Sequence, residues 1–154
     1  MTGSLLVVTG LQREAQIAAG NDVVTLCSGG DPQLLRTRLD KHFSAPLGRA
    51  VKGVLSFGLA GGLSPDLHPG DLVIASHVLA EGRRHPANAD WNRIIVAAFD
   101  DELRVHRGPM AGSDQVLIGP DDKSDLHEAT GALAVDMESH IAAEYARSHN
   151  LPFA

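Results

Sequence analysis

Short, mostly apolar runs alternate along the chain with segments in which apolar residues recur every three or four positions. The apolar runs have the length of β-strands and lie at residues 5–9, 23–27, 53–57, 71–79 and 132–136. Runs without alternating polar residues suit strands that are covered on both faces. The helical spacing occurs at residues 31–45, 90–99, 121–130 and 138–149. Strands that alternate with helices predict an α/β layer fold with a largely parallel sheet.

Capping residues sharpen the ends of the predicted helices. Asp31 followed by Pro32 is typical of a helix start, Asp90 is predicted to cap the second helix, and Gly131 is predicted to end the third. The second helix carries the clearest apolar stripe, formed by Trp91, Ile94, Ile95, Ala98 and Phe99. The polar residues 81–89, which precede this helix, are predicted to form a long surface loop.

The bulk composition fits a globular protein. The chain has 154 residues, of which 44% are apolar, and this is enough to build a core. Its net charge of −6 leaves no excess of basic groups to neutralise phosphates and argues against nucleic-acid binding. The single cysteine, Cys27, excludes an intrachain disulfide and fits a reducing compartment. No apolar run approaches the roughly 20 residues of a membrane-spanning helix, and the first residues lack a signal peptide's basic region, so we predict a cytoplasmic protein.

Polar residues and glycines follow the predicted strands at the positions where ligands bind in open α/β sheets. Glu14 follows the first strand, either as a first-turn glutamate that favours the helix dipole or as a carboxylate that activates a water. Ser28 and Gly29 follow the second strand. With Gly30 they let backbone amides approach an anion or a sugar oxygen, or simply form a turn before the helix.

The third and fourth strands lead to further candidates. The glycines near the third strand lack the spacing of a dinucleotide-binding fingerprint, whereas Ala60 and Gly61 leave room for a flat ring. Glu138 begins the last helix and either caps it or accepts two hydrogen bonds from a vicinal diol, with Met137 packed against the sugar. The eight histidines lack the pairing of a zinc site, so no metal is predicted.

These segments resemble the nucleoside phosphorylase and nucleosidase superfamily over essentially the whole chain. The resemblance rests on residues 9–14, 28–30, 57–63, 69–71, 112–114 and 135–138. Residues 55–58 and 130–143 resemble most closely the bacterial hopanoid-associated phosphorylases, which are thought to remove adenine from adenosylhopane. The resemblance implies a three-layer α/β/α fold with a central, mostly parallel or mixed sheet.

The resemblance also implies roles for individual residues. Glu138 matches the glutamate that binds the ribose 2′ and 3′ hydroxyls, and Met137 matches the methionine that lies against the ribose. Glu14 matches the carboxylate that activates water in methylthioadenosine nucleosidases. Positions near the base and ribose are implied at Ala60 and Gly61, and the lining of the purine pocket at Val116 and Leu117.

Two departures from the family bear on the reaction. Many hexameric purine nucleoside phosphorylases bind phosphate through an arginine and a serine after the third strand, where this chain has Ser56 and Leu59. The alternative phosphate ligands are Arg13, Arg83 and Arg84. Family members also continue past the Leu-Pro-Phe segment to an aspartate that helps to protonate the departing purine. The chain is therefore expected to form a single domain, residues 1–154, that is incomplete at its C-terminal end.

The sequence thus predicts an enzyme that cleaves the N-glycosidic bond of an adenosine-type nucleoside, adenosylhopane included. Phosphate is the expected co-substrate, and no cofactor is expected. Hydrolysis, as in the methylthioadenosine nucleosidases, is one alternative, and nucleoside binding without turnover is another. The expected partners are a small nucleoside and, by the resemblance, further copies of the chain. No integral membrane segment is expected, although a lipid-linked substrate would require peripheral membrane contact.

Overall fold

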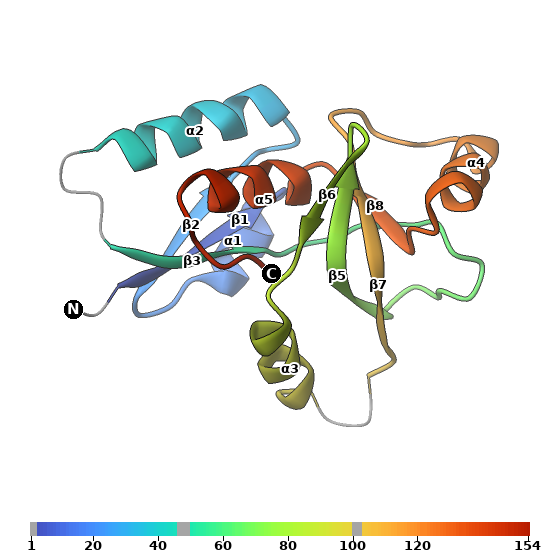
Figure 1. Cartoon of the computed structure of the whole chain (residues 1–154), viewed down its shortest axis with the longest axis horizontal. Helices are drawn as coiled ribbons and strands as arrows, with labels where there is room; N and C mark the ends of the chain where they lie inside the picture. Colours follow the sequence, from blue (N-terminus) through green and yellow to red (C-terminus); the bar gives the residue numbers. More distant parts are fainter. Residues whose placement is uncertain (1–2, 46–49, 100–102) are drawn as a thin grey trace.

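The described strands form two sheets that lie side by side in the computed structural model, which describes residues 3–45, 50–99 and 103–154 (Figure 1). In the first sheet, all strands are parallel and the order is β2 (Val23–Cys27), β1 (Ser4–Thr9) and β3 (Val51–Ser56). The second sheet is mixed, in the order β4 (Gly61–Gly62), β8 (Ala134–Asp136), β7 (Val105–Gly112), β5 (Leu72–Ala80) and β6 (Arg83–Pro86). The predicted α/β architecture is confirmed, with its strands divided between two hydrogen-bonded sheets.

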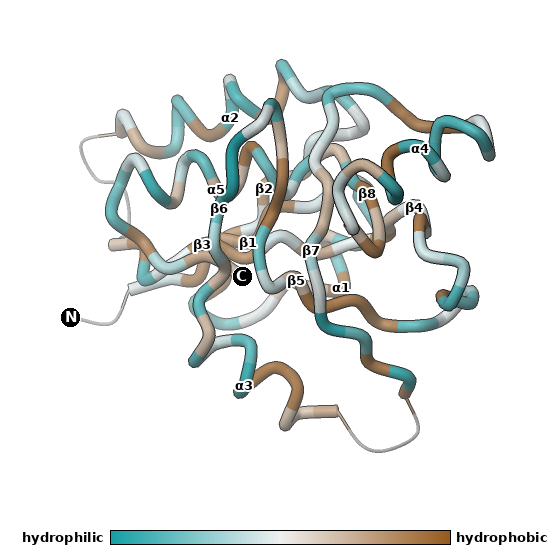
Figure 2. Tube along the Cα trace, turned by 45° about the vertical axis from the view of Figure 1, so that its right-hand side comes forward, coloured by the Kyte–Doolittle hydropathy of each residue, from teal (hydrophilic) through white to brown (hydrophobic). Residues whose placement is uncertain are grey.

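Helices cover both faces of the first sheet, with α2 and α5 together on one face and α1 on the other (Figure 1). The described helices are α1 (Gln12–Ala18), α2 (Pro32–Ser44), α3 (Ala89–Ala97), α4 (Pro120–Thr130) and α5 (Ser139–Ser148). Hydrophobic residues concentrate on β1 and β3 in the interior, whereas α4 is largely hydrophilic (Figure 2). The main core contains the fully buried side chains of Leu6, Val8, Leu35, Leu39, Val54, Val78 and Ile141. Because α5 packs against β3 and also against β5, β6 and β7, this helix lies at the junction of the two sheets.

The predicted helix ends are confirmed for α2 and α4 and corrected for α3. Asp31 caps α2, because its side-chain oxygen accepts hydrogen bonds of 2.9 and 3.1 Å from two first-turn amides. Gly131 ends α4 in the left-handed conformation, with φ of 69°. Asp90 lies inside α3 and is not its cap. That role belongs to Asn88, whose side chain accepts a hydrogen bond from the amide of Trp91 at 3.0 Å.

Residues 81–89, predicted as one long polar loop, contain a strand. Glu81 and Gly82 have φ of 50° and 71° and form a tight turn that reverses the chain. Strand β6 follows and pairs antiparallel with β5, so that Arg83 lies opposite Ala80. An edge strand can remain polar because most of its side chains meet solvent, and the sequence therefore carried no apolar signal for it.

The apolar stripe predicted on α3 is not buried as a whole. Trp91 packs against Gly53 of β3, where an added Cβ would lie 2.2 Å from the indole ring. The buried residue of the helix is Asn92, whose side-chain amide donates to the carbonyl of Ala75 at 2.8 Å. Ile94, in contrast, is 68% exposed. The spacing thus predicted the helix correctly but not the face that packs.

The Leu-Pro-Phe segment runs beside β3, as a strand would. Phe153 forms a parallel bridge with Val54, and the amide of Ser56 donates to the carbonyl of Ala154 at 2.8 Å. This pairing places the segment on the side of β3 opposite β1. Among the helices of the described residues, none combines the length and the apolar character that crossing a membrane requires.

Candidate active site

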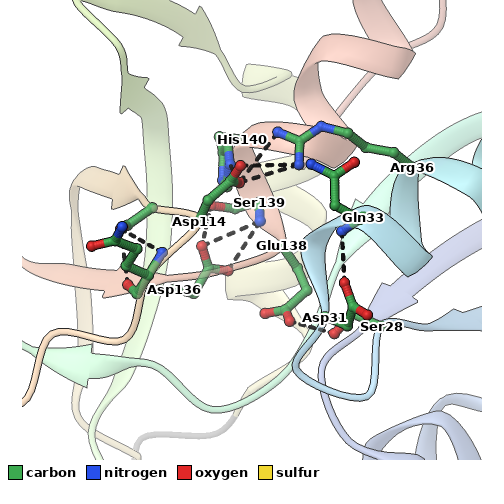
Figure 3. Close-up of polar contacts among 11 residues, drawn as sticks. Ser28, Asp31, Gln33, Arg36, Asp114, Asp136, Glu138, Ser139 and His140 are labelled. Atoms are coloured by element: carbon green, nitrogen blue, oxygen red, sulfur yellow. Dashed lines mark hydrogen bonds and ion pairs between the residues drawn. The ribbon is translucent and has the colours of Figure 1, made fainter.

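Glu138 and Ser28 meet where β8 and β2 end. The hydroxyl of Ser28 donates to Glu138 Oε1 at 2.6 Å, although the two residues are 110 positions apart (Figure 3). The amide of Gly30 donates to Ser28 Oγ at 3.0 Å, so the serine oxygen accepts one bond while its proton is directed to the carboxylate. Gly29 has φ of 65°, a conformation that favours glycine at this turn. Glu138 is 8% exposed, so its position is fixed in a largely buried setting.

A second buried carboxylate, Glu14, is held by three backbone amides. Its Oε2 accepts hydrogen bonds from Gly10 at 3.0 Å and Leu11 at 2.8 Å, and its Oε1 accepts one from Leu59 at 2.9 Å. The first two bonds satisfy amides at the start of α1, as expected for a first-turn glutamate. The third bond ties the carboxylate to the loop after β3. Glu14 is therefore both a helix-capping group and a fixed carboxylate at the ends of two strands.

Two glycines make room for these carboxylates. Gly10 lies between them: its amide binds Glu14, and a Cβ added to it would lie 3.1 Å from Glu138 Oε1. A Cβ on Gly58 would lie 2.7 Å from Glu14 Oε2, which is too close for any side chain. In the sequence these glycines stand out only as parts of motifs, not as the positions that let the carboxylates approach the backbone. The requirement for glycine at these two positions becomes visible only once the carboxylates are placed.

Ala60, Gly61 and Met137 adjoin this pair through the pairing of β4 with β8. Gly61 lies opposite Val135 in this antiparallel pair, so Ala60, which precedes β4, and Met137, which follows β8, lie at the same end of the ladder. Ala60 is exposed and Met137 is half-buried. The structure therefore brings together the predicted residues from four strand ends: Glu14, Ser28, Gly29, Ala60, Gly61, Met137 and Glu138.

Val116 and Leu117 lie on the segment between β7 and α4, and their side chains point to different surroundings. Val116 is 65% exposed, whereas Leu117 packs against a small core formed by Leu63, Ala111, Ala132 and Val135. This segment is linked to the rest of the site through the neighbouring Asp114 rather than through the two predicted residues.

The arginines considered as phosphate ligands have other partners or lie at the surface. Arg83 forms an ion pair with Glu144, with 3.6 Å between Nη1 and Oε1. Nη2 of Arg84 lies 3.4 Å from Nδ1 of His77. Arg13 is exposed. Within residues 3–45, 50–99 and 103–154, no lysine or arginine forms a hydrogen bond or ion pair with Glu14, Ser28 or Glu138. The same residues gather no group of three or more histidine, cysteine, aspartate or glutamate side chains that could hold a metal ion.

Residues 16–154 match the family model of the phosphorylase superfamily. The chain belongs to this superfamily. It is 27% identical over 112 residues to a guanosine phosphorylase of Halorubrum lacusprofundi, a match that covers 66% of this chain and 46% of the relative. The chain thus spans about half the length of the curated relative it matches.

Solved structures of nucleosidases and a hydrolase share the phosphorylase-superfamily fold of this chain. A 5′-methylthioadenosine/S-adenosylhomocysteine nucleosidase from Helicobacter pylori superposes with a TM-score of 0.83 at 16% identity, over 99% of this chain and 82% of that one. A futalosine hydrolase from the same organism gives 0.82 at 15% identity, over 99% and 88%. The corresponding nucleosidase from S. pneumoniae, bound to a transition-state inhibitor, gives 0.78 at 19% identity, over 97% and 82%.

A third acid, Asp136, takes over the capping role that the sequence allowed for Glu138. Its carboxylate accepts hydrogen bonds from the amide of Ser139 at 3.2 Å and from the Ser139 hydroxyl, while Glu138 makes no capping bond (Figure 3). Burial raises the pKa of Asp136 to about 6, against the opposing effect of the Ser139 hydrogen bond and with a smaller contribution from the charge of Glu138. The two acids of the Val-Asp-Met-Glu motif thus have separate tasks, and Glu138 is left available to a ligand.

Replacing Asp136 by asparagine is expected to make this phosphorylase-superfamily protein more stable at neutral pH than the parent. Because the pKa of Asp136 is raised in the folded state, the parent carboxyl contributes its full stabilisation to the folded protein below its unfolded pKa of 3.8. It loses that stabilisation as the pH rises to about 6. The difference between the two pKa values corresponds to at most about 3 kcal/mol. The free energy of unfolding of both proteins, measured in urea between pH 4.5 and 8, should differ by an amount that grows up to about pH 6. A difference that does not change with pH would contradict the raised pKa of Asp136.

Proposed function

We propose that this protein cleaves the N-glycosidic bond of a purine nucleoside and releases the free base. The observation that carries the proposal is the pair of buried carboxylates on either side of Gly10, one bonded to Ser28 and the other to three amides. Cleavage of this bond develops positive charge on the sugar, and a carboxylate that binds the sugar hydroxyls stabilises it. Glu138 takes this role in the proposal, with Met137 against the ribose.

The remaining predicted residues surround this pair in the proposed site. Ser28 and Gly29 support Glu138 on the sugar side, and the small residues Ala60 and Gly61 allow the nucleoside to lie against the backbone. The nucleobase lies toward the segment that carries Val116 and Leu117. This arrangement uses the ends of several strands, as ligand sites in α/β folds generally do.

Water is the nucleophile that the surroundings of Glu14 favour. A carboxylate offers about four acceptor sites, of which three are taken here by backbone amides, so one remains for a water molecule. The same amides would otherwise be donors for a phosphate, and the carboxylate occupies them. Phosphorolysis is the second candidate, because the relative from Halorubrum lacusprofundi is a guanosine phosphorylase.

Release of adenine or guanine is expected to proceed without phosphate. The protein would be incubated with adenosine and, separately, with guanosine, in the presence and absence of phosphate, and the free base would be measured by chromatography. A rate that phosphate leaves unchanged, with free ribose as the second product, is the expected result. Release that requires phosphate and yields ribose 1-phosphate would replace hydrolysis by phosphorolysis. Calorimetry that detects base binding without any release would instead favour a nucleoside-binding protein without turnover.

Apolar side chains at the edge of the site support a nucleoside with an apolar group on its ribose, of which adenosylhopane is the extreme case. Leu11 and Leu59, whose amides hold Glu14, are 50% and 80% exposed. Exposed apolar side chains grouped at a site are typical of surfaces that bind apolar ligands. A 5′-alkylthio adenosine should therefore compete with adenosine for the site, and its KM should fall as the alkyl chain lengthens.

A further inference from the structure

Asp114 joins three separate parts of the chain. It follows β7 and accepts hydrogen bonds from both terminal nitrogens of Arg36 on α2, with Nη1 at 3.1 Å from Oδ2 and Nη2 at 3.2 Å from Oδ1 (Figure 3). Its Oδ1 also lies 2.8 Å from Nε2 of His140 on α5. Bidentate contacts between arginine and a carboxylate fix orientation as well as distance. The segment after β7 is thereby tied to two helices at once.

His140 is held in a single orientation. It is 7% exposed, and it packs so closely on Gly112 that an added Cβ there would lie 2.4 Å from the Cβ of His140. A carboxylate can only accept, so Nε2 carries the proton of the bond to Asp114 when the ring is neutral. Within the described part of the chain, Nδ1 is buried without a partner. Asp114 is therefore the group that fixes the tautomer and the direction of this ring.

The same two helices also meet at the sugar side of the candidate site. Ser28, just before α2, donates to Glu138, just before α5, and Arg36 and His140 lie further along these helices. Asp114 thus contacts α5 at His140, two residues after Glu138. The start of the segment after β7 is fixed as well, because the amide of Ser113 donates to the carbonyl of Asp136, the last residue of β8, at 2.9 Å.

We propose that Asp114 is a positioning residue that Arg36 and His140 hold in place. Through it, the segment 113–117, which bears the base-facing Val116, keeps a constant spacing from Glu138. The proposal rests on the proposed function, because it assigns the segment to the nucleobase. Contacts to the base that are equal in the bound substrate and in the transition state change KM rather than kcat. Disturbing the segment should therefore weaken base binding more than it slows bond cleavage.

Replacement of Asp114 by asparagine tests this role, with Asp125→Asn on the exposed face of α4 as the matched control. Asp114→Asn should raise the KM for the nucleoside and the Kd for adenine about tenfold, with kcat within about threefold of the parent. Arg36→Gln should have a similar effect. The double variant should be no worse than Asp114→Asn alone, since both changes break the same contact. Asp125→Asn should behave as the parent.

Hydrogen exchange of the amides in residues 113–117 separates the failure of this proposal from the failure of the proposed function. Exchange should be faster in Asp114→Asn than in the parent or in Asp125→Asn. If the parent binds adenine and Asp114→Asn binds it equally well, or if kcat falls as far as KM rises, the positioning role is wrong. If the parent neither binds nor releases a purine, the proposed function is wrong. In that case the positioning role is judged by hydrogen exchange alone, and equal exchange of residues 113–117 in Asp114→Asn and in the parent would overturn it.

Discussion

Replacing Glu138 by glutamine is expected to lower kcat/KM for base release by at least about a hundredfold, which corresponds to about 3 kcal/mol of transition-state stabilisation. Glutamine keeps an oxygen that can accept the hydrogen bond from Ser28, so the local structure should persist. It loses the negative charge that both stabilises a cationic sugar and accepts strong hydrogen bonds from two ribose hydroxyls. The loss should appear in both kcat and KM, because the hydroxyls are bound before and during cleavage.

The matched control for this change is Glu128→Gln, the same substitution on an exposed glutamate of α4. Both variants should melt within about 3 °C of the parent, since neither removes a buried apolar group. Base release is measured by chromatography at several nucleoside concentrations. Turnover by Glu138→Gln equal to that of the control would show that Glu138 does not bind the sugar.

The elements that could be predicted from the sequence are those whose signal is local. The run that became β1 is mostly apolar because both of its faces are covered, whereas the half-buried edge strand β2 is marked by its β-branched residues. Asp31 caps α2 through amides only two and three residues away. Strand β7 gave no such signal, since its sequence Val-His-Arg-Gly-Pro-Met-Ala-Gly mixes polar residues, glycine and proline. It is held instead by parallel pairing with β5 and β8, which no local pattern reveals.

The candidate site shows the same division between local and distant information. Its carboxylates could be predicted because Glu14 and Glu138 each follow a predicted strand, and ligands in α/β folds bind at the carboxyl ends of strands. Their partners could not, because every residue has an amide and nothing marks Leu59 as a donor to a side chain 45 positions away. Nothing in the sequence marks His140 as buried, whereas the structure leaves it 7% exposed and packs it against Gly112.

Replacing Glu14 by glutamine is expected to lower kcat by about a hundredfold or more, the usual contribution of a positioned general base. The glutamine side chain has one acceptor oxygen where the carboxylate has two, so its NH2 group must face at least one of the amides of Gly10, Leu11 and Leu59. An amide left without its acceptor in a buried site costs about 1–3 kcal/mol, so this variant should also unfold at lower urea concentration than the parent.

The two carboxylates should therefore fail in different ways. In the proposed site Glu14 binds the water and three backbone amides but not the base. The Kd for adenine should therefore change little in Glu14→Gln while kcat falls, whereas Glu138→Gln should change both kcat and KM. Glu144→Gln, on the exposed side of α5, controls for the loss of one negative charge. An unchanged kcat in Glu14→Gln would remove water activation from this residue. If release then proved to depend on phosphate, the three amides and Glu14 would be a structural cap, and the nucleophile would have to enter from another side of the ribose.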